Sequence, residues 1–401
     1  MFKLKNREDM IDLALISFMR EELATTPTKF VRYMASEIPW DDRMIGLVGP
    51  RGVGKSTLVK QQIISKENDG YLQLYVSADH SYFANHTLIE LADLFVKEDG
   101  KRLVIDEIHK YDGWSKELKQ IYDSHPRLSI VFTGSSILDI KKGGADLSRR
   151  ALVFEMQGLS FREYLEIFEG VSFPVYDIED ITENKIEYIP DFHPLPYFRQ
   201  YLANGYYPFA RLPRFDIRMQ QIFSETLEVD IPAYANMTPA TVRKLKQMML
   251  IISENAPYKP NMLNLSVELK ISKNDVPNYL VYLEKAGMLA LLRDSTAGMR
   301  GLGKVEKVFI DNPNLMSVLA GGMPNVGNLR ETFFYNQTRV RNNVVSSKIS
   351  DFEINGVTYE VGGANKGRKQ LEKAKKGIVV RDDIEYGYGD VVPLWTFGMN
   401  Y

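Results

Sequence analysis

The sequence has no cysteine among its 401 residues. This absence excludes disulfide bridges, thiolate metal sites and cysteine nucleophiles, and it is compatible with a reducing cytosol. Apolar runs are also short, about five residues at most, far below the ~20 that a membrane helix needs. The first residues lack the apolar core of a signal peptide. We therefore expect a cytoplasmic protein without a membrane partner.

Neither acidic nor basic residues are in large excess. The formal net charge is −2, so the composition lacks the basic excess that indicates nucleic-acid binding. Hydrophobic residues make up 44% and charged residues 25% of the chain, which is typical of globular proteins. A chain of this length predicts two to four domains rather than a single core.

A glycine-rich loop carries the clearest chemical signal, with the spacing G-x-x-x-x-G-K-[ST]. The loop consists of Gly49, Pro50, Arg51, Gly52, Val53, Gly54, Lys55 and Ser56, followed by Thr57. Its glycines allow successive backbone N–H groups to point at one anion, and a helix beginning at Lys55 adds its positive dipole end. Lys55 would contact the β- and γ-phosphates, and the Ser56 hydroxyl would ligate Mg²⁺. The loop therefore predicts a site for ATP and Mg²⁺.

Two acids, Asp106 and Glu107, follow the apolar residues 103–105. An acid at the end of such a strand lies at the carboxyl edge of the sheet, beside the phosphates. Asp106 would hold the Mg²⁺, and Glu107 would orient and polarise the attacking water. The pair predicts hydrolysis in addition to binding.

Two further groups of polar residues have alternative interpretations. The segment 133–136 ends an expected strand, and Ser135 in it would bond the γ-phosphate or the attacking water; a simple turn is the alternative. Arg149 and Arg150 lie between the last two expected strands. An arginine from a neighbouring subunit would stabilise the transition state and imply a homo-oligomer, whereas a surface pair is the alternative.

Apolar segments alternate with helical segments up to residue 157, which predicts an α/β fold: a mostly parallel sheet with helices on both faces. The expected strands are 44–48, 72–76, 103–105, 129–133 and 152–154. Helices are expected at 55–65, 88–95 and 114–122, after a helix at 7–21. We divide this part into an N-terminal helical segment at 1–39 and a P-loop core at 40–157.

The remainder of the chain predicts three further regions. Residues 158–237 form a helical lid, in which the acidic run 163–191 is most simply a solvated surface. Residues 238–300 have the order helix, short helix, helix, strand of a winged helix-turn-helix. Residues 301–401 predict a small α+β domain, with a hairpin at Asn355-Gly356 and a basic helix at 367–376.

Six segments together resemble the AAA-type ATPases of bacteria and archaea that carry a C-terminal domain of unknown function. These segments are 49–57, 105–114, 118–123, 131–136, 159–164 and 201–208. The resemblance extends over about 40–400 and implies that Lys55 and Ser56 bind nucleotide and Mg²⁺ and that Asp106 and Glu107 form the Walker B pair. Arg149 or Arg150 matches the region of the family's arginine finger.

The C-terminal domain of that family distantly resembles restriction endonucleases, which hold Mg²⁺ with acids and an E-x-K motif. The matching acids here would be Glu331, Asp351 and Glu360. Gly362 stands where the lysine is expected, and Lys366 would have to substitute for it from the loop. We therefore expect a degenerate, nuclease-like domain that binds DNA or a partner, rather than an active nuclease.

Local basic charge leaves DNA binding open. Residues 239–294 contain eight bases and five acids, and 339–376 contain nine bases and four acids. Such patches are needed for phosphate contacts. The expected recognition helix offers only Lys273, Asn274 and Asn278 to bases, so packing between domains is the alternative.

Three functions fit this sequence. The first is an Mg²⁺-dependent ATPase that acts as a nucleotide-driven switch on a macromolecular partner. The second is a DNA-binding ATPase or nuclease-type factor in DNA transactions or defence. The third is an interaction protein with a regulatory nucleotide site of low turnover.

Overall fold

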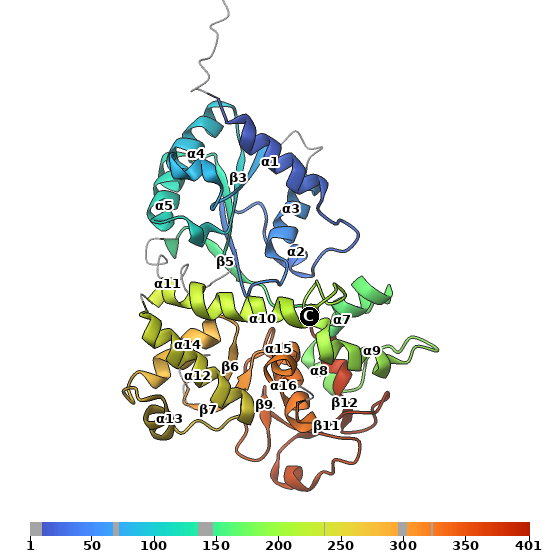
Figure 1. Cartoon of the computed structure of the whole chain (residues 1–401). Helices are drawn as coiled ribbons and strands as arrows, with labels where there is room; N and C mark the ends of the chain where they lie inside the picture. Colours follow the sequence, from blue (N-terminus) through green and yellow to red (C-terminus); the bar gives the residue numbers. More distant parts are fainter. Residues whose placement is uncertain (1–9, 67–71, 135–146, 236, 296–302, 322–323) are drawn as a thin grey trace, which may run out of the picture. The chain divides into compact units, whose positions relative to one another are not determined.

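The computed structural model describes residues 10–66, 72–134, 147–235, 237–295, 303–321 and 324–401. The chain forms two compact units, Met1–Gln157 and Gly158–Tyr401. Figure 1 colours the chain along its sequence, from blue at the N-terminus to red at the C-terminus.

The first unit is built on a five-stranded parallel sheet in the order β2-β3-β4-β1-β5. Its strands are β1 Met44–Val48, β2 Gln73–Ser77, β3 Arg102–Asp106, β4 Ser129–Gly134 and β5 Leu152–Glu155. The first four are buried along almost their whole length, as expected for a sheet covered on both faces. The predicted α/β fold is therefore confirmed for this unit.

Helices cover both faces of this sheet, with α1 and α3 on one face and α4 and α5 on the other (Figure 1). The helices are α1 Leu13–Ala24, α2 Met34–Glu37, α3 Lys55–Ser65, α4 Leu88–Lys97 and α5 Trp114–Ser124. The chain passes from β1 to the far strand β2 and then returns through β3 and β4. The carboxyl end of β1 therefore lies at a switch in strand order, where parallel sheets bind ligands.

The second unit begins with short helices that correspond to the expected lid. They are α7 Phe161–Tyr164, α8 Ile178–Thr182, α9 Pro194–Gln200, α10 Phe215–Glu225 and α11 Ile231–Ala235. Three of the helical runs continue through single π-helical turns at Leu165–Glu169, Tyr201–Gly205 and Thr226–Asp230.

Three helices and a hairpin follow: α12 Pro239–Asn255, α13 Met262–Leu269, α14 Val276–Lys285, β6 Leu289–Arg293 and β7 Val305–Ile310. The element order is the one expected of a winged helix, which remains a prediction. Because β7 pairs antiparallel with β6, the hairpin crosses the domain boundary that we expected at residue 300.

The last part of the chain has two helices and a five-stranded mixed sheet. Its elements are α15 Pro313–Leu319, α16 Val326–Thr338, β8 Val344–Ser346, β9 Phe352–Ile354, β10 Val357–Gly362, β11 Gly377–Arg381 and β12 Val391–Pro393. Strands β8, β9 and β10 are antiparallel, whereas β10, β11 and β12 are parallel. Asn355 and Gly356 join β9 to β10 with φ angles of 51° and 77°, as the predicted Asn-Gly hairpin requires.

The basic helix predicted at 367–376 is wrong in extent. Only Lys369–Lys373 is helical, and it is a 3₁₀ turn. Like charges four residues apart, such as those of Lys369 and Lys373, destabilise an α-helix.

One hydrophobic core runs through most of the second unit. Phe161 and Tyr201 from the expected lid pack in the same cluster as Phe309, Phe333 and Trp395. The lid and C-terminal divisions therefore share a core, to which β6 of the expected winged helix adds Ala290 and Leu292.

Candidate functional site

The loop between β1 and α3 has the backbone conformation of a phosphate-binding turn. Gly49, Gly52 and Gly54 have φ angles of 149°, 79° and 100°, which L side chains rarely adopt. A Cβ atom at Gly49 would also lie 2.2 Å from the carbonyl oxygen of Met156. Glycine at this position is therefore required for two independent reasons.

The Lys55 side chain lies along this loop and is buried. Its Nζ donates hydrogen bonds to the carbonyl oxygens of Gly49 at 2.9 Å and Pro50 at 2.8 Å. The ammonium group is thus held beside the start of α3, where backbone N–H groups have no helical partner.

Asp106, at the carboxyl end of β3, is the centre of a buried hydrogen-bond network. Its Oδ1 accepts from Ser56 Oγ at 3.0 Å and from Thr133 Oγ1. Its Oδ2 accepts from the Tyr75 hydroxyl at 2.7 Å. The P-loop serine and the acid of the third strand thus lie in direct contact.

Glu107 follows in a left-handed conformation, with φ 52° and ψ 41°. Its backbone N–H donates to Thr133 Oγ1 at 3.1 Å, and its Oε2 lies 3.6 Å from His109 Nε2. Burial, and next the charge of Asp106, raise the pKa of the Glu107 carboxyl, while Lys55 and Arg51 oppose the rise. A carboxylate with a raised pKa is a better proton acceptor at neutral pH.

Sequence reasoning overlooked Tyr75. It lies on β2, whose Ser77 pairs in register with Asp106 of β3. Burial, followed by the charge of Asp106 and its hydrogen bond, strongly raises the pKa of the Tyr75 phenol, so the hydroxyl keeps its proton. The signal in the sequence was a hydroxyl-bearing aromatic between the apolar Leu74 and Val76, and its meaning depended on knowing that β2 and β3 are neighbours.

Arg32 is a second overlooked residue. It is buried, and its guanidinium donates to the carbonyl oxygens of Val53 at 2.7 Å and Gln157 at 2.9 Å. Gln61 on α3 donates from Nε2 to the carbonyl oxygen of Phe30 at 2.8 Å. Residues that precede β1 therefore hold the P-loop and α3 in place through hydrogen bonds.

The two candidate arginines have different surroundings. Arg150 forms a bidentate pair with Asp123, with Nε–Oδ1 at 2.9 Å and Nη2–Oδ2 at 3.0 Å. Arg149 is exposed. Ser135 lies outside the described residues.

The nuclease-like positions also lie together. Lys307 Nζ is 3.2 Å from Glu331 Oε2 and 3.4 Å from Asp351 Oδ1, and Lys366 pairs with Glu360. Lys307 was not anticipated. Within the described residues, no group of three or more His, Cys, Asp or Glu side chains is arranged to hold a metal ion. The acids present here thus do not fit the Mg²⁺ that the nuclease resemblance implies.

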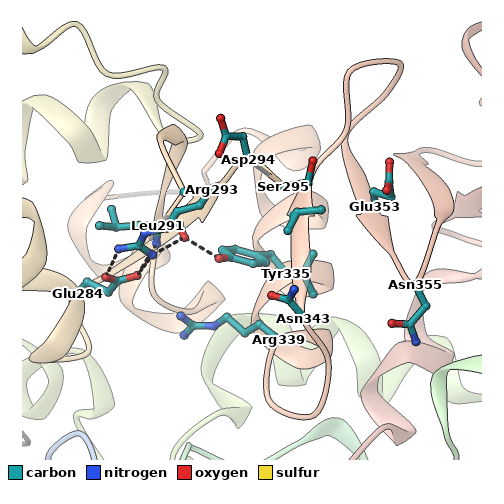
Figure 2. A pocket seen from close by; sticks show the side chains of 13 residues that line it. Glu284, Leu291, Arg293, Asp294, Ser295, Tyr335, Arg339, Asn343, Glu353 and Asn355 are labelled. Atoms are coloured by element: carbon teal, nitrogen blue, oxygen red, sulfur yellow. Dashed lines mark hydrogen bonds and ion pairs between the residues drawn. The ribbon is translucent and has the colours of Figure 1, made fainter. Parts of the chain in front are cut away.

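A cavity of about 300 Å³ lies in the second unit and is lined by charged residues (Figure 2). Arg293 donates to both carboxylate oxygens of Glu284, at 2.8 and 2.7 Å. Arg339 is paired with Asp311 at 2.5 Å, and Tyr335 donates to the Leu291 carbonyl at 2.8 Å. The arginine and tyrosine donors at this cavity already have acceptors within the protein. The geometry of the cavity therefore does not indicate a catalytic site.

Two models of protein families match parts of the chain. A family model described as an AAA domain matches residues 41–165, and one described as a domain of unknown function matches residues 195–325. None of the curated proteins matches the chain. No helix in the described part of the chain has the length and apolar character needed to cross a membrane.

Solved structures give only distant similarity. A replication initiator DnaA bound to AMPPCP and single-stranded DNA is 14% identical, with a TM-score of 0.29 over 71% of this chain and 93% of that chain. AMPPCP-bound DnaA from Aquifex aeolicus is 13% identical, with a TM-score of 0.28 and the same coverage. C. elegans PCH-2 is 16% identical, with a TM-score of 0.25 over 70% of this chain and 69% of that chain. The AAA-domain match over residues 41–165 and the P-loop geometry support an ATP-binding P-loop domain, and these distant structures add nothing about its role.

Proposed function

We propose that the AAA domain of this chain is an Mg²⁺-dependent ATPase that acts as a nucleotide-driven switch on a macromolecular partner. The observation that carries the proposal is the Asp106 carboxylate, which receives hydrogen bonds from Ser56, Thr133 and Tyr75 beside a P-loop lysine. Three donors on one carboxylate hold its oxygens in fixed positions. A carboxylate held at this position is the expected partner of a phosphate-bound cation.

ATP binding would use groups that the loop already presents. The N–H groups of residues 49–54 and the start of α3 would bind the phosphate oxygens. Lys55 would exchange its hydrogen bonds with the Gly49 and Pro50 carbonyls for bonds to the β- and γ-phosphates. The exchange leaves the ammonium near its present place, so little rearrangement is needed.

Ser56 and Asp106 are the residues that would hold Mg²⁺, because their oxygens lie 3.0 Å apart. The ion supplies positive charge that offsets the charge of the phosphates. Tyr75 and Thr133 would fix the orientation of the acid.

Glu107 would accept the proton of the attacking water. The water oxygen forms a bond to the γ-phosphorus, and the bond to the β–γ bridging oxygen breaks. ADP and phosphate leave, and the proton passes from Glu107 to solvent. The raised pKa of Glu107 suits this exchange, and the bond from its N–H to Thr133 holds its backbone in place.

Arg149 is the better candidate for an arginine finger. It is exposed, whereas the guanidinium of Arg150 already has Asp123 as a bidentate partner. A finger acting on a neighbouring subunit implies that a homo-oligomer is the active form.

A DNA-binding ATPase is the second candidate. Lys273, Asn274 and Asn278, at and beside the start of α14, are all exposed, as direct base contacts require. Absence of any DNA binding at low ionic strength, where electrostatic binding is strongest, would remove this candidate. An interaction protein of low turnover is the third.

The proposal is tested by measuring phosphate release from ATP in the presence of Mg²⁺, with and without added DNA. Lys55→Ala should abolish nucleotide binding and turnover, because the phosphates lose their fixed positive charge. Lys97→Ala is the matched control, since Lys97 is exposed in the last turn of α4. Turnover by Lys55→Ala equal to that of the control would refute the proposal. Turnover that rises only with DNA would favour the second candidate, and nucleotide binding without turnover would favour the third.

A further inference from the structure

Five charged side chains gather in the second unit from separate parts of the fold. Glu331 comes from α16, Asp351 directly precedes β9, and Glu360 lies on β10. Lys307 comes from β7 in the other sheet, and Lys366 follows β10. We propose that the Lys307 ammonium stands where a divalent cation would bind between Glu331 and Asp351. The nuclease-like cluster is therefore a metal-free ion-pair lock, in which Lys307 supplies the positive charge between the two acids.

Lys307 has the position of a bound cation. Its Nζ lies 3.2 Å from Glu331 and 3.4 Å from Asp351, and 5.9 Å from the centroid of the Phe352 ring. The Lys307 side chain is 17% exposed, and those of Glu331 and Asp351 are 21% and 18% exposed. Burial opposes the charged lysine, but Glu331 and Asp351 outweigh it and raise the pKa of Lys307. The ammonium thus stays charged at neutral pH.

The other carboxylates also have protein partners. Asp351 Oδ2 accepts from the Val361 N–H at 3.0 Å. Glu360, which is 2% exposed, is paired with Lys366 and accepts from Ser350 Oγ. Each acid of the cluster therefore has a donor from the chain itself.

Lys366 reaches Glu360 only because residue 362 is glycine. The stem of Lys366 lies directly on Gly362, and a Cβ atom there would come within 2.5 Å of Lys366 Cγ. The second cation of the cluster is thus the Lys366 ammonium, four residues beyond position 362, where the E-x-K motif would have its lysine.

A divalent metal has different requirements from an ammonium group. Mg²⁺ needs about six oxygen ligands at ~2.0–2.1 Å, and Mn²⁺ prefers similar oxygen ligands. No set of three acidic or histidine ligands is arranged for this among the residues that the structure describes. A metal entering the cluster would also be repelled by Lys307. Removing the ammonium would leave Glu331 and Asp351 facing each other without a cation, which favours recruitment of a divalent ion.

The test counts Mn²⁺ ions bound to the nucleotide-free full chain, from the electron paramagnetic resonance signal of free Mn²⁺. Every variant carries Asp106→Asn, so the ATP site does not contribute. We expect Lys307→Met to gain one Mn²⁺ per chain, with affinity on the order of tenfold or more above the parent because the repelling ammonium is gone, and a higher Tm with Mn²⁺. Adding Glu331→Gln should abolish the gain. Lys304→Met is the matched control and should behave as the parent, because Lys304 is exposed and pairs with Glu306.

Two results would overturn the inference. One is a folded Lys307→Met variant that gains no Mn²⁺. The other is a parent chain whose bound Mn²⁺ is lost on Asp351→Asn substitution, since that chain would already hold a metal there. If circular dichroism shows that Lys307→Met does not fold, the comparison of the parent with Asp351→Asn decides: equal Mn²⁺ binding supports the lock.

Discussion

Tyr75→Phe removes one hydroxyl from the centre of the nucleotide site and leaves the ring in place. The phenol donates to Asp106 Oδ2 at 2.7 Å, and the two residues are 2% and 5% exposed. The Tyr75 ring stacks on Phe18 with centroids 6.0 Å apart, and phenylalanine keeps this contact. The substitution therefore isolates the hydrogen bond from the packing.

The magnitude follows from the charge and burial of the pair. A hydrogen bond to a charged group contributes about 1.5–3 kcal/mol, and water cannot readily replace this donor in a buried site. In a unit of this size the loss corresponds to a fall in Tm of roughly 3–12 °C. Because Tyr75 acts on Asp106 and not on ATP, the apparent Mg²⁺ affinity in ATP turnover should fall about 10–100-fold. Nucleotide binding without Mg²⁺ should be unchanged.

Titration of turnover with Mg²⁺ at saturating ATP is the assay. Tyr122→Phe is the control, because it also removes a tyrosine hydroxyl from the first unit, on the half-buried face of α5. An unchanged Mg²⁺ dependence in folded Tyr75→Phe would refute the positioning role. A fall in Tm alone would show that Tyr75 only stabilises the fold.

Three further predictions test other parts of the site. Glu107→Gln should lower turnover by about 10²–10⁴-fold. It should also raise the Tm near pH 7. The pKa of Glu107 is raised in the folded state, so its ionised carboxylate destabilises the folded protein above that pKa. Below the pKa of the carboxyl in the unfolded chain both states are protonated, and the Tm difference should vanish. Arg149→Ala should lower turnover more than Arg150→Ala, which should mainly lower thermal stability, and the reverse order would reject Arg149 as the finger. Arg32→Met should weaken ATP binding while leaving the Mg²⁺ dependence intact, as measured by nucleotide titration.

Local sequence patterns were sufficient for the P-loop and the strand-end acids. The glycines and Lys55 are contiguous, and Asp106 and Glu107 directly follow a short apolar run, so no knowledge of strand order was needed. The Asn355-Gly356 hairpin was predictable for the same reason, because both residues tolerate positive φ angles.

Residues that act across strands could not be predicted. The contact of Tyr75 with Asp106 depends on β2 lying beside β3 and not beside β1. The contact of Lys307 with Glu331 and Asp351 depends on a strand of one sheet facing a helix and a strand end of another. These are long-range choices that a single sequence does not determine.

Helical periodicity was also interrupted in the lid region. Each π-helical turn inserts an extra residue into the helical repeat, so apolar positions beyond it shift around the helix. The turn at Tyr201–Gly205 places Tyr201 and Leu202 in the core beside Phe198. A regular 3.6-residue pattern does not describe such a run.

Gly362 and Lys366 depend on each other for their places in this cluster. A side chain at residue 362 would begin where the Lys366 stem now lies, because its Cβ atom would come within 2.5 Å of Lys366 Cγ. A lysine introduced at residue 362 would therefore displace Lys366 from its pair with Glu360. An E-x-K motif in this chain thus requires two coordinated changes, one at residue 362 and one at residue 366.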